Sequence, residues 1–347
     1  MNKKALIFGV TGQDGTYLAE LLLAKGYKVY GVVRRASTPN TGRIAHLLKN
    51  PDFSESFTLV DGDLTDGLSI ARVLQDTTPH EIYNLAAQTD VYKSFFMPEF
   101  TSNTNALGAL RILETLRVLG RAKEVRYYQA STSELFGNST QESQNEDTPF
   151  RPCSPYGIAK LHAYWTTVNY RNAFHMHASN GILFNHESPI RGEHFVSRKI
   201  TRAVAAIHHG RAKKLVIGNL NAKRDWGHAK DFVQGIWLMM QQEKADDYVL
   251  ATGESHTVRE CVEIAFSVVG KTVRWEGKSA DEKGYDKATG NLLVEVDPML
   301  FRPTEVENLR GDSTKARKRL GWEPSIRLSE LIEEMVNADL THFAKHP

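Results

Sequence analysis

The sequence has few of the features that mark secreted, membrane-bound or metal-binding proteins. Its 347 residues include only two cysteines, Cys153 and Cys261, which cannot build a disulfide framework. The 13 histidines show none of the CxxC or HExxH spacings that are typical of metal sites. The apolar stretch over residues 5–10 is too short for a signal peptide, and no later run approaches a membrane-spanning length. We therefore expect a soluble, cytoplasmic protein with no metal and no membrane partner.

Charge of either sign is also not in excess. Lys and Arg number 43 against 41 Asp and Glu, which leaves a formal charge of +2. With 24% charged and 41% hydrophobic residues the composition is that of an ordinary globular protein, not of a disordered one. Nucleic acid is therefore not indicated as a partner, and the length allows one large domain or two ordinary ones.

In the first half of the chain, short apolar runs alternate with stretches of helical periodicity. The first run, residues 5–8, ends in glycine, and a predicted helix over 16–25 stops at Gly26. Alternation of this kind predicts βαβ units and a Rossmann-type, doubly wound α/β fold with a parallel sheet. The further predicted strands are 28–33, 57–60, 81–85 and 125–129, and the further predicted helices are 68–75 and 106–119.

The alternation loosens in the second half. We expect residues 1–180 to form a nucleotide-binding domain to which some later segments return, and residues 181–347 to form mainly a smaller substrate-binding subdomain. Residues 277–297 are polar enough to predict a surface excursion.

Three glycines, Gly9, Gly12 and Gly15, form a GxxGxxG motif between the first strand and the first helix. Their missing side chains would let the backbone approach a pyrophosphate at the helix N-terminus. A tight turn that needs glycine only for packing is the alternative. As dinucleotide-binding residues in this loop we predict Gly9, Thr11, Gly12, Gln13, Asp14 and Gly15.

The end of the second strand bears on the choice of dinucleotide. An NAD-binding fold places an acidic residue there, whereas this chain has Arg34 and Arg35, followed by Ser37. These residues favour the 2′-phosphate of NADP; a solvated basic turn or a subunit contact is the alternative. At the ends of the third and fourth strands, where the two ends of a cofactor would lie, we expect contacts from Asp63, Leu64, Leu85, Ala86, Ala87, Gln88 and Thr89.

Tyr156 and Lys160 lie four residues apart on a helix that we predict to begin at Pro155, so their side chains share one face. An ammonium beside a phenol stabilises the phenolate, which can then take a proton from an alcohol. The pair follows a strand that ends in the hydroxyl cluster 131–133 and Glu134, where active sites of open α/β sheets lie.

These features together resemble the extended short-chain dehydrogenase/reductase superfamily. Within it, the strings GVTGQDG, STSELFG, SPYGIAK, GILFNHESP, GNLNAKRDWGHAKD and RPTEV resemble the GDP-mannose 4,6-dehydratase family over nearly the whole chain. The resemblance implies oxidation of GDP-mannose at C4 with NADP, elimination of water across C5 and C6, and return of the hydride to C6.

The resemblance also implies roles for four residues. Tyr156 would take the proton of the 4-hydroxyl, Lys160 would stabilise the phenolate and hold the nicotinamide ribose, and Thr132 would bond the oxygen at C4. Glu134 would remove the C5 proton, which becomes acidic once C4 is a ketone; a helix N-terminal carboxylate is its alternative role.

Binding residues in the second half rest mainly on the same motifs. His186 and Arg191 resemble family positions at the cofactor, while Trp226 is expected in the core. As substrate-binding residues we predict Thr132, Ser133, Glu134, Asn185, Lys199, Gly218, Lys223, Arg224, Arg302 and Glu305.

Two positions depart from the pattern of relatives. Ser133 stands where dTDP-glucose dehydratases have an aspartic acid, so either Glu134 or a water would have to protonate the departing 6-hydroxyl. Phe100 stands where we expect a tyrosine that reaches the cofactor.

Two other functions would use the same cofactor-binding fold. A nucleotide-sugar 4-epimerase would share the fold and the Tyr/Lys pair but needs no C5 base, and a silent NADP-binding sensor would need no catalytic set.

We further expect a homodimer or homotetramer that pairs through helix 107–116 and the helix from Pro155, with residues 34–43 at a subunit contact.

Overall fold

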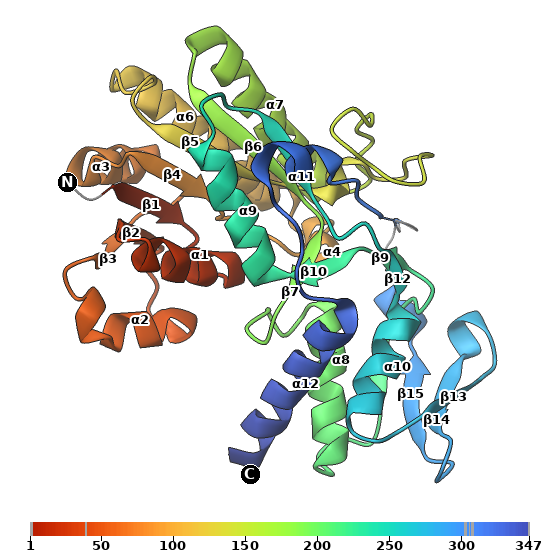
Figure 1. The fold of residues 1–347 in the computed structure, drawn as a ribbon. Coiled ribbons are helices and arrows are strands. Elements are labelled where there is room, and N and C mark those ends of the chain that lie inside the picture. The colour runs from red at the N-terminus through yellow and green to blue at the C-terminus, as the bar shows by residue number, and fades with distance from the viewer. Residues whose placement is uncertain (1–2, 39, 302–303, 305, 307–308, 346–347) are drawn as a thin grey trace. The chain divides into compact units, whose positions relative to one another are not determined.

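The computed structural model of the protein describes residues 3–38, 40–301, 304, 306 and 309–345 (Figure 1). The chain divides into two compact units, each assembled from separate segments. The first comprises Met1–Phe184, Ala229–Leu250 and Gly311–Glu323, and the second comprises Asn185–His228, Ala251–Arg310 and Pro324–Pro347.

A seven-stranded, all-parallel sheet forms the centre of the first unit, in the order β11-β6-β5-β4-β1-β2-β3. The predicted doubly wound fold is thereby confirmed. The direction of the strand order reverses at β1 and β4, which leaves a crevice at their carboxyl ends where such folds bind ligands. The strands are β1 (Lys4–Phe8), β2 (Lys28–Val33), β3 (Phe57–Asp61), β4 (Glu81–Asn84), β5 (Arg126–Thr132), β6 (His177–Leu183) and β11 (Asp247–Leu250).

Helices cover the sheet in two groups. α1 (Gln13–Ala24) packs on α9 (Ala229–Gln241), while α6 (Gly108–Val118) packs on both α3 (Gly67–Thr77) and α7 (Pro155–Phe174). Leu6 and Phe8 of β1 belong to the core beneath the second group, and Ile7 between them is also fully buried. Because side chains alternate along a strand, β1 must be covered on both faces, as in parallel sheets generally.

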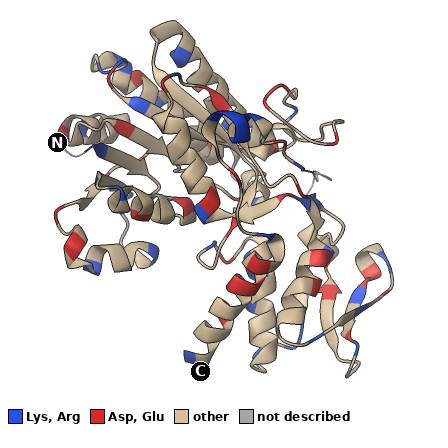
Figure 2. Ribbon diagram, in the orientation of Figure 1, with Lys and Arg blue, Asp and Glu red and all other residues tan. Residues whose placement is uncertain are grey.

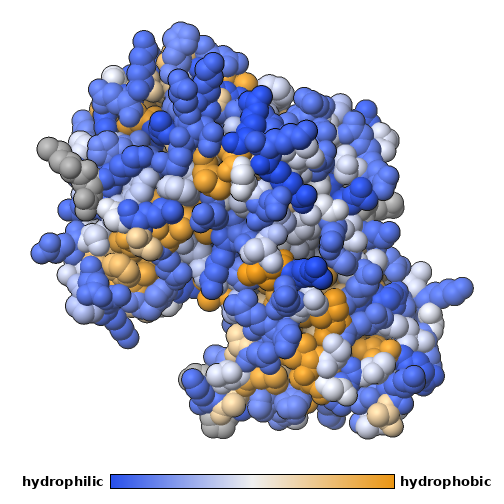
Figure 3. All heavy atoms as spheres, viewed as in Figure 1, coloured by the Kyte–Doolittle hydropathy of each residue, from blue (hydrophilic) through white to orange (hydrophobic). Residues whose placement is uncertain are grey.

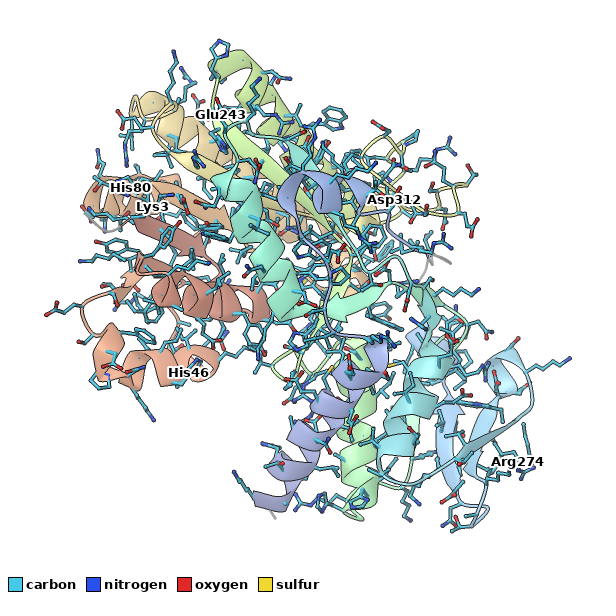
Figure 4. All side chains as sticks on the ribbon, viewed as in Figure 1. Lys3, His46, His80, Glu243, Arg274 and Asp312 are labelled. Atoms are coloured by element: carbon cyan, nitrogen blue, oxygen red, sulfur yellow. The ribbon has the colours of Figure 1, made fainter. Side chains whose placement is uncertain are left out.

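The amino edge of the sheet is closed by a buried carboxylate, Glu81, which is 1% exposed. It accepts hydrogen bonds from Tyr83 Oη at 2.7 Å, Lys3 Nζ at 3.2 Å and Gln241 Nε2 at 3.3 Å. Lys3 and its neighbour His80 are labelled in Figure 4. These bonds connect β4 with α9 and with Lys3, the residue before β1, at the end of the sheet opposite to the predicted site.

The second unit packs α8 (Val196–His208), α10 (Val258–Val268) and α12 (Leu328–Lys345) around its own core, which includes Trp226 as expected. In the view of Figure 3, apolar residues gather over these helices. Its four-stranded sheet has the order β13-β14-β15-β8. The strands of this unit are β7 (Asn185–Glu187), β8 (Leu215–Ile217), β9 (Lys223–Arg224), β10 (Trp226–His228), β12 (His256–Thr257), β13 (Val273–Glu276), β14 (Lys283–Asp286) and β15 (Leu292–Val296).

The predicted surface excursion over residues 277–297 is wrong, because this segment holds two of those strands. Its polarity is misleading: the buried positions of β14 are Gly284 and Asp286, and Lys271 Nζ lies 2.8 Å from a carboxylate oxygen of Asp286. In β14 the buried Asp286 carboxylate, paired with a partly exposed Lys271 ammonium, stands where a strand usually buries an apolar side chain.

Charges of both signs are mixed over the described part of the chain. Figure 2 shows Lys and Arg interspersed with Asp and Glu over the elements of both units. No described helix is both long and apolar enough to cross a membrane. Within the same residues no group of His, Cys, Asp and Glu side chains could hold a metal ion, and both cysteines are free.

Asp247 anchors the outer strand β11 to the sheet and to α7. Its carboxylate accepts two bonds from the Arg171 guanidinium at 2.8 and 2.7 Å, one from Tyr164 Oη at 3.0 Å and one from Asn180 Nδ2 at 2.9 Å. Burial alone would raise the pKa of Asp247, but the bonds and the charge of Arg171 outweigh it and lower that pKa. The folded state therefore favours the ionised carboxylate.

We predict that Asp247→Asn lowers the free energy of unfolding by about 3 kcal/mol, because it leaves a largely buried guanidinium without its counter-charge. Asp246→Asn is the matched control: its partners Lys315 and Arg319 are more exposed, so the loss should stay below about 1 kcal/mol. Since the folded pKa of Asp247 is lowered, the difference between wild type and Asp247→Asn should be complete above roughly pH 4 and shrink as the pH falls further. Denaturant unfolding measures it; equal losses in the two variants would contradict the role of Asp247.

Candidate active site

The loop between β1 and α1 brings bare backbone to the crevice. Gly9 has φ +87°, and a Cβ there would lie 2.8 Å from the backbone nitrogen of Ala86 after β4. A Cβ on Gly15 would lie 2.2 Å from the carbonyl oxygen of Gly9, so α1 must begin directly against the loop. These two positions require glycine for close approach, which is what a pyrophosphate-binding turn needs.

The N-terminus of α1 is exposed at Gly12, and no described side chain caps it. Asp14 lies in the first turn and accepts a bond from Gln13 Nε2 at 3.0 Å. The backbone N–H groups and the helix dipole of this end provide a positive potential that suits a phosphate. The loop residues predicted to hold a dinucleotide are thus brought together and fit that group.

Basic side chains flank this loop at the end of β2. Arg34, Arg35 and Ser37 are all exposed. Arg43, expected from the sequence only at a subunit contact, donates from Nη1 to the carbonyl of Thr11 at 3.3 Å. The structure therefore adds a third guanidinium beside the glycine loop, and no local sequence signal indicated its contact with Thr11.

The loop after β3 contains Asp63 and Leu64. Asp63 Oδ1 accepts bonds from the backbone and the hydroxyl of Thr65, both at 2.8 Å, and its own N–H donates to Ser69 Oγ at 3.1 Å. Leu64 is 5% exposed. The loop thus has a fixed shape at the carboxyl edge of the sheet.

The loop after β4 is anchored through Gln88. Its backbone N–H and carbonyl bond the Asn105 side chain at 2.8 and 2.9 Å, and its Nε2 donates to Thr101 Oγ1 at 3.1 Å. Leu85, Ala86 and Ala87 precede it and are partly exposed, as is Gln88 itself, whereas Thr89 is exposed. Asn105 and Thr101 are buried positioning residues that the sequence analysis missed.

Tyr156 and Lys160 lie on the first turns of α7, which begins at Pro155 as predicted and is capped by Ser154 Oγ. Lys160 is 3% exposed, donates to the carbonyl of Ala130 in β5 at 2.8 Å, and has its Nζ 5.9 Å from the centre of the Tyr156 ring. Burial lowers the pKa of Lys160 from 10.5 to about 8, against a smaller opposing effect of Asp14. The ammonium is therefore still the main form at neutral pH.

Thr132 and Glu134 lie where β5 meets the start of α7. Thr132 Oγ1 accepts the backbone N–H of Glu134 at 3.2 Å. A Cβ on Gly157 would lie 3.0 Å from the Glu134 carbonyl oxygen, so the turn that carries Glu134 packs against the residue next to Tyr156. The four predicted catalytic residues thus lie on two adjoining elements at the carboxyl edge of the sheet. Ser133, between Thr132 and Glu134 in the sequence, is buried.

Phe100, the second departure, lies on α5 (Pro98–Ser102) in the first unit and is 38% exposed.

The remaining predicted residues lie in the second unit. His186 of β7 is buried, and Arg191 forms an ion pair with Glu187 at 3.0 Å. Arg224 is 6% exposed, and its Nη1 donates to the carbonyls of Lys223 and Val306. The partly exposed residues here are Asn185 and Gly218, the exposed ones are Lys199 and Lys223, and Arg302 and Glu305 lie outside the described residues.

Comparison with known proteins gives one consistent result. The sequence profile of the family described as GDP-mannose 4,6 dehydratase matches residues 6–335. The chain is 56% identical over 341 residues to a GDP-mannose 4,6-dehydratase of Sinorhizobium fredii, covering 98% of this chain and 97% of that protein. It is 52% identical over 345 residues to the GDP-mannose 4,6 dehydratase of Homo sapiens, covering 99% and 93%.

The fold is shared more widely than the sequence. A solved structure of dTDP-glucose 4,6-dehydratase from Bacillus anthracis, in complex with NAD, matches with a TM-score of 0.79 at 19% identity, covering 99% of this chain and 97% of that one. Likeness at that level of identity concerns the fold alone.

Proposed function

The chain belongs to the GDP-mannose 4,6-dehydratase family, and we propose that it carries out that family's reaction with Thr132, Glu134, Tyr156 and Lys160 as its catalytic residues. GDP-mannose is converted to GDP-4-keto-6-deoxymannose and water, so the protein is a lyase. The observation that carries the assignment of residues is the buried Lys160 ammonium beside Tyr156, at the strand end where Glu134 begins its turn.

NADP is the cofactor, and the glycine loop, Arg34, Arg35 and Ser37 are the residues that hold it, together with the loops after β3 and β4. When bound, it would accept a hydride from C4 of the sugar and supply it again to C6; C5 would then take up a proton, which balances the one that Tyr156 removes from the 4-hydroxyl. The exposed guanidinium groups after β2, with Arg43 near Thr11, suit the additional 2′-phosphate, and no carboxylate at the end of that strand repels it.

Tyr156 acts first as the base on the 4-hydroxyl. Its phenolate takes the hydroxyl proton while the hydride leaves C4, and the product of this step is a ketone. Burial lowers the pKa of Lys160 only to about 8, so the side chain is mainly charged at neutral pH. Its hydrogen bond to the Ala130 carbonyl holds the ammonium beside Tyr156, where its charge stabilises the phenolate. Thr132 donates to the oxygen at C4.

Glu134 acts second, on the carbon next to the ketone. Once C4 is a carbonyl, the C5–H bond is acidic, and the carboxylate can remove that proton. The electron pair then forms the C5–C6 double bond while the 6-hydroxyl leaves. The Ser133 hydroxyl is a poor acid, so the departing oxygen takes its proton either from Glu134 directly or through a bound water, and leaves as water.

Substrate contacts from the second unit are proposed on the same family match. Lys199 and Lys223 are exposed cations suited to a diphosphate, and Asn185 can bond sugar hydroxyls. The part proposed for Arg224 includes holding the Val306 backbone, because its guanidinium donates to the Val306 carbonyl. His186 and Arg191 are proposed at the cofactor; Gly218, Arg302 and Glu305 remain predicted substrate contacts.

Self-association is proposed through α6 and α7, which pack on each other and expose apolar side chains. Leu107 just before α6 is 40% exposed and Val118 at its end 69%, while Ile158 and Trp165 of α7 are 58% and 55% exposed. A particle near twice the 39.0 kDa of one chain by light scattering would support the dimer, and one near 39.0 kDa would contradict it.

The two free cysteines agree with a cytoplasmic setting.

The function itself is tested by mixing the protein with GDP-mannose and NADP and analysing the sugar nucleotide by mass spectrometry. The expected product is lighter than the substrate by one water. A product of unchanged mass would instead be an epimer, and untouched substrate would indicate a binding protein; either result contradicts the proposed reaction.

The division of labour predicts different defects in two variants. Glu134→Gln should still form NADPH on mixing with GDP-mannose, because C4 oxidation does not use the carboxylate, but should lose no water. Tyr156→Phe should block both events. NADPH absorbance follows the first event and mass spectrometry the second. Glu142→Gln, an exposed carboxylate in the loop after Glu134, is the control. Water loss at the wild-type rate in Glu134→Gln would show that another group is the base.

The cofactor assignment predicts a selective loss in Arg35→Ala. A charge-assisted bond to phosphate contributes about 1.5 to 3 kcal/mol, so NADP binding should weaken roughly ten- to a hundredfold. NAD lacks the 2′-phosphate and its affinity should barely change. Binding titrations with both dinucleotides measure this, with Lys49→Ala as an exposed-cation control. Equal losses for the two dinucleotides would remove Arg35 from the 2′-phosphate site.

A further inference from the structure

The segment that precedes α6 departs from regular α-helix beside the loops after β3 and β4. Residues Asn103–Leu107 form a turn of π-helix between α5 and α6. Such turns insert an extra residue into a helix and occur frequently at functional sites. Asn105 of this turn bonds Gln88 in the loop after β4, as described above, and Asn103 takes part in a second set of contacts.

That second set centres on Arg111, one of the residues of α6. Its Nη1 donates to the carbonyl oxygens of Leu64 at 2.9 Å and of Asn103 at 3.1 Å, and its Nη2 donates to Asn103 Oδ1 at 2.7 Å. The planar guanidinium therefore joins the loop after β3 to the π-turn through one rigid group. None of these acceptors carries a full charge, so the bonds fix backbone geometry and do not neutralise the arginine.

The loop after β3 needs such support because β3 is the outer strand of the sheet, with β2 as its one neighbour. A Cβ on Gly108 would lie 2.9 Å from Leu64 Cβ, so the start of α6 also packs directly against this loop. Leu64 is thus held by close packing at its side chain and by Arg111 at its carbonyl.

We propose that Arg111 is a positioning residue for the adenine end of the bound dinucleotide: it holds the Asp63–Leu64 backbone in the conformation that receives the cofactor. The proposal rests on the proposed function, in which Asp63 and Leu64 are cofactor contacts. NADP and NAD share their adenine, so Arg111 contributes equally to the binding of both.

The test is a pair of binding titrations on Arg111→Met. Both dinucleotides should bind about tenfold more weakly, from the loss of bonds donated by a charged group. The turnover number at saturating NADP should stay within about twofold of wild type, because the catalytic residues lie at β5 and α7. Arg117→Met is the matched control: Arg117 is on the same helix but pairs with exposed Glu114, and its affinities should be unchanged.

Two further variants separate positioning from general damage. Arg111→Lys can reach one acceptor but not all three, so its loss should be intermediate. Asn103→Ala removes one acceptor and should also weaken dinucleotide binding. Because the two residues share these bonds, the fold-loss of affinity in the double variant with Arg111→Met should be smaller than the product of the two single fold-losses. If Arg111→Met does not fold, Asn103→Ala decides alone.

Unchanged affinities in folded Arg111→Met, or in Asn103→Ala where that variant decides, would overturn the proposal. A loss confined to NADP would also overturn it, because that pattern belongs to the 2′-phosphate site. If the wild-type protein binds neither dinucleotide, the proposed cofactor fails and the role of Arg111 fails with it.

Discussion

A buried ammonium group at the carboxyl edge of the sheet is the constraint on which the arrangement of the first unit depends. Lys160 is almost fully removed from water, and a charge in that position is tolerated only with a partner close by. The Ala130 carbonyl supplies it at 2.8 Å. Because Ala130 belongs to β5 and Lys160 to α7, this bond fixes the strand that ends in Thr132 relative to the helix that carries Tyr156, and so determines where the two catalytic groups meet.

Close backbone approach is the second requirement, and it explains why the turn at this edge is rich in glycine. Gly9 and Gly15 let the first loop lie against Ala86 and against the start of α1. The loops after β3 and β4 each keep one sheet-like backbone bond past the strand end, from Gly62 N–H to the Val33 carbonyl and from Leu85 N–H to the Phe8 carbonyl, both at 3.0 Å. Farther along, side chains from the π-turn and from α6 hold these loops, through Asn105 on Gln88 and Arg111 on Leu64. Polar contacts from the π-turn and α6 therefore hold the loops at the carboxyl edge of the sheet.

The sequence predicts well whatever depends on neighbouring residues. The glycine turn, the helix from Pro155 and the pairing of Tyr156 with Lys160 follow from spacing and local periodicity, and the structure brings them together at one edge. Contacts such as those of Arg43 with Thr11 and Arg111 with Leu64 join residues far apart in the chain, and no periodicity predicts them. Of the two strands within residues 277–297, β14 gives no apolar signal because its buried positions are Gly284 and a paired Asp286, whereas β15 does bury the apolar side chains Leu293, Val294 and Val296.

The proposed site depends most on the charge and burial of the Lys160 ammonium, which a direct titration tests. The side-chain signal of Lys160 can be followed by NMR in protein with labelled lysine and assigned by its absence in Lys160→Met. We expect a midpoint near pH 8, since burial lowers the pKa of this ammonium. Charge would then be present at neutral pH and lost as the pH rises above 8. A midpoint at the ordinary lysine value, near 10.4, would contradict the buried ammonium on which the proposed site is built.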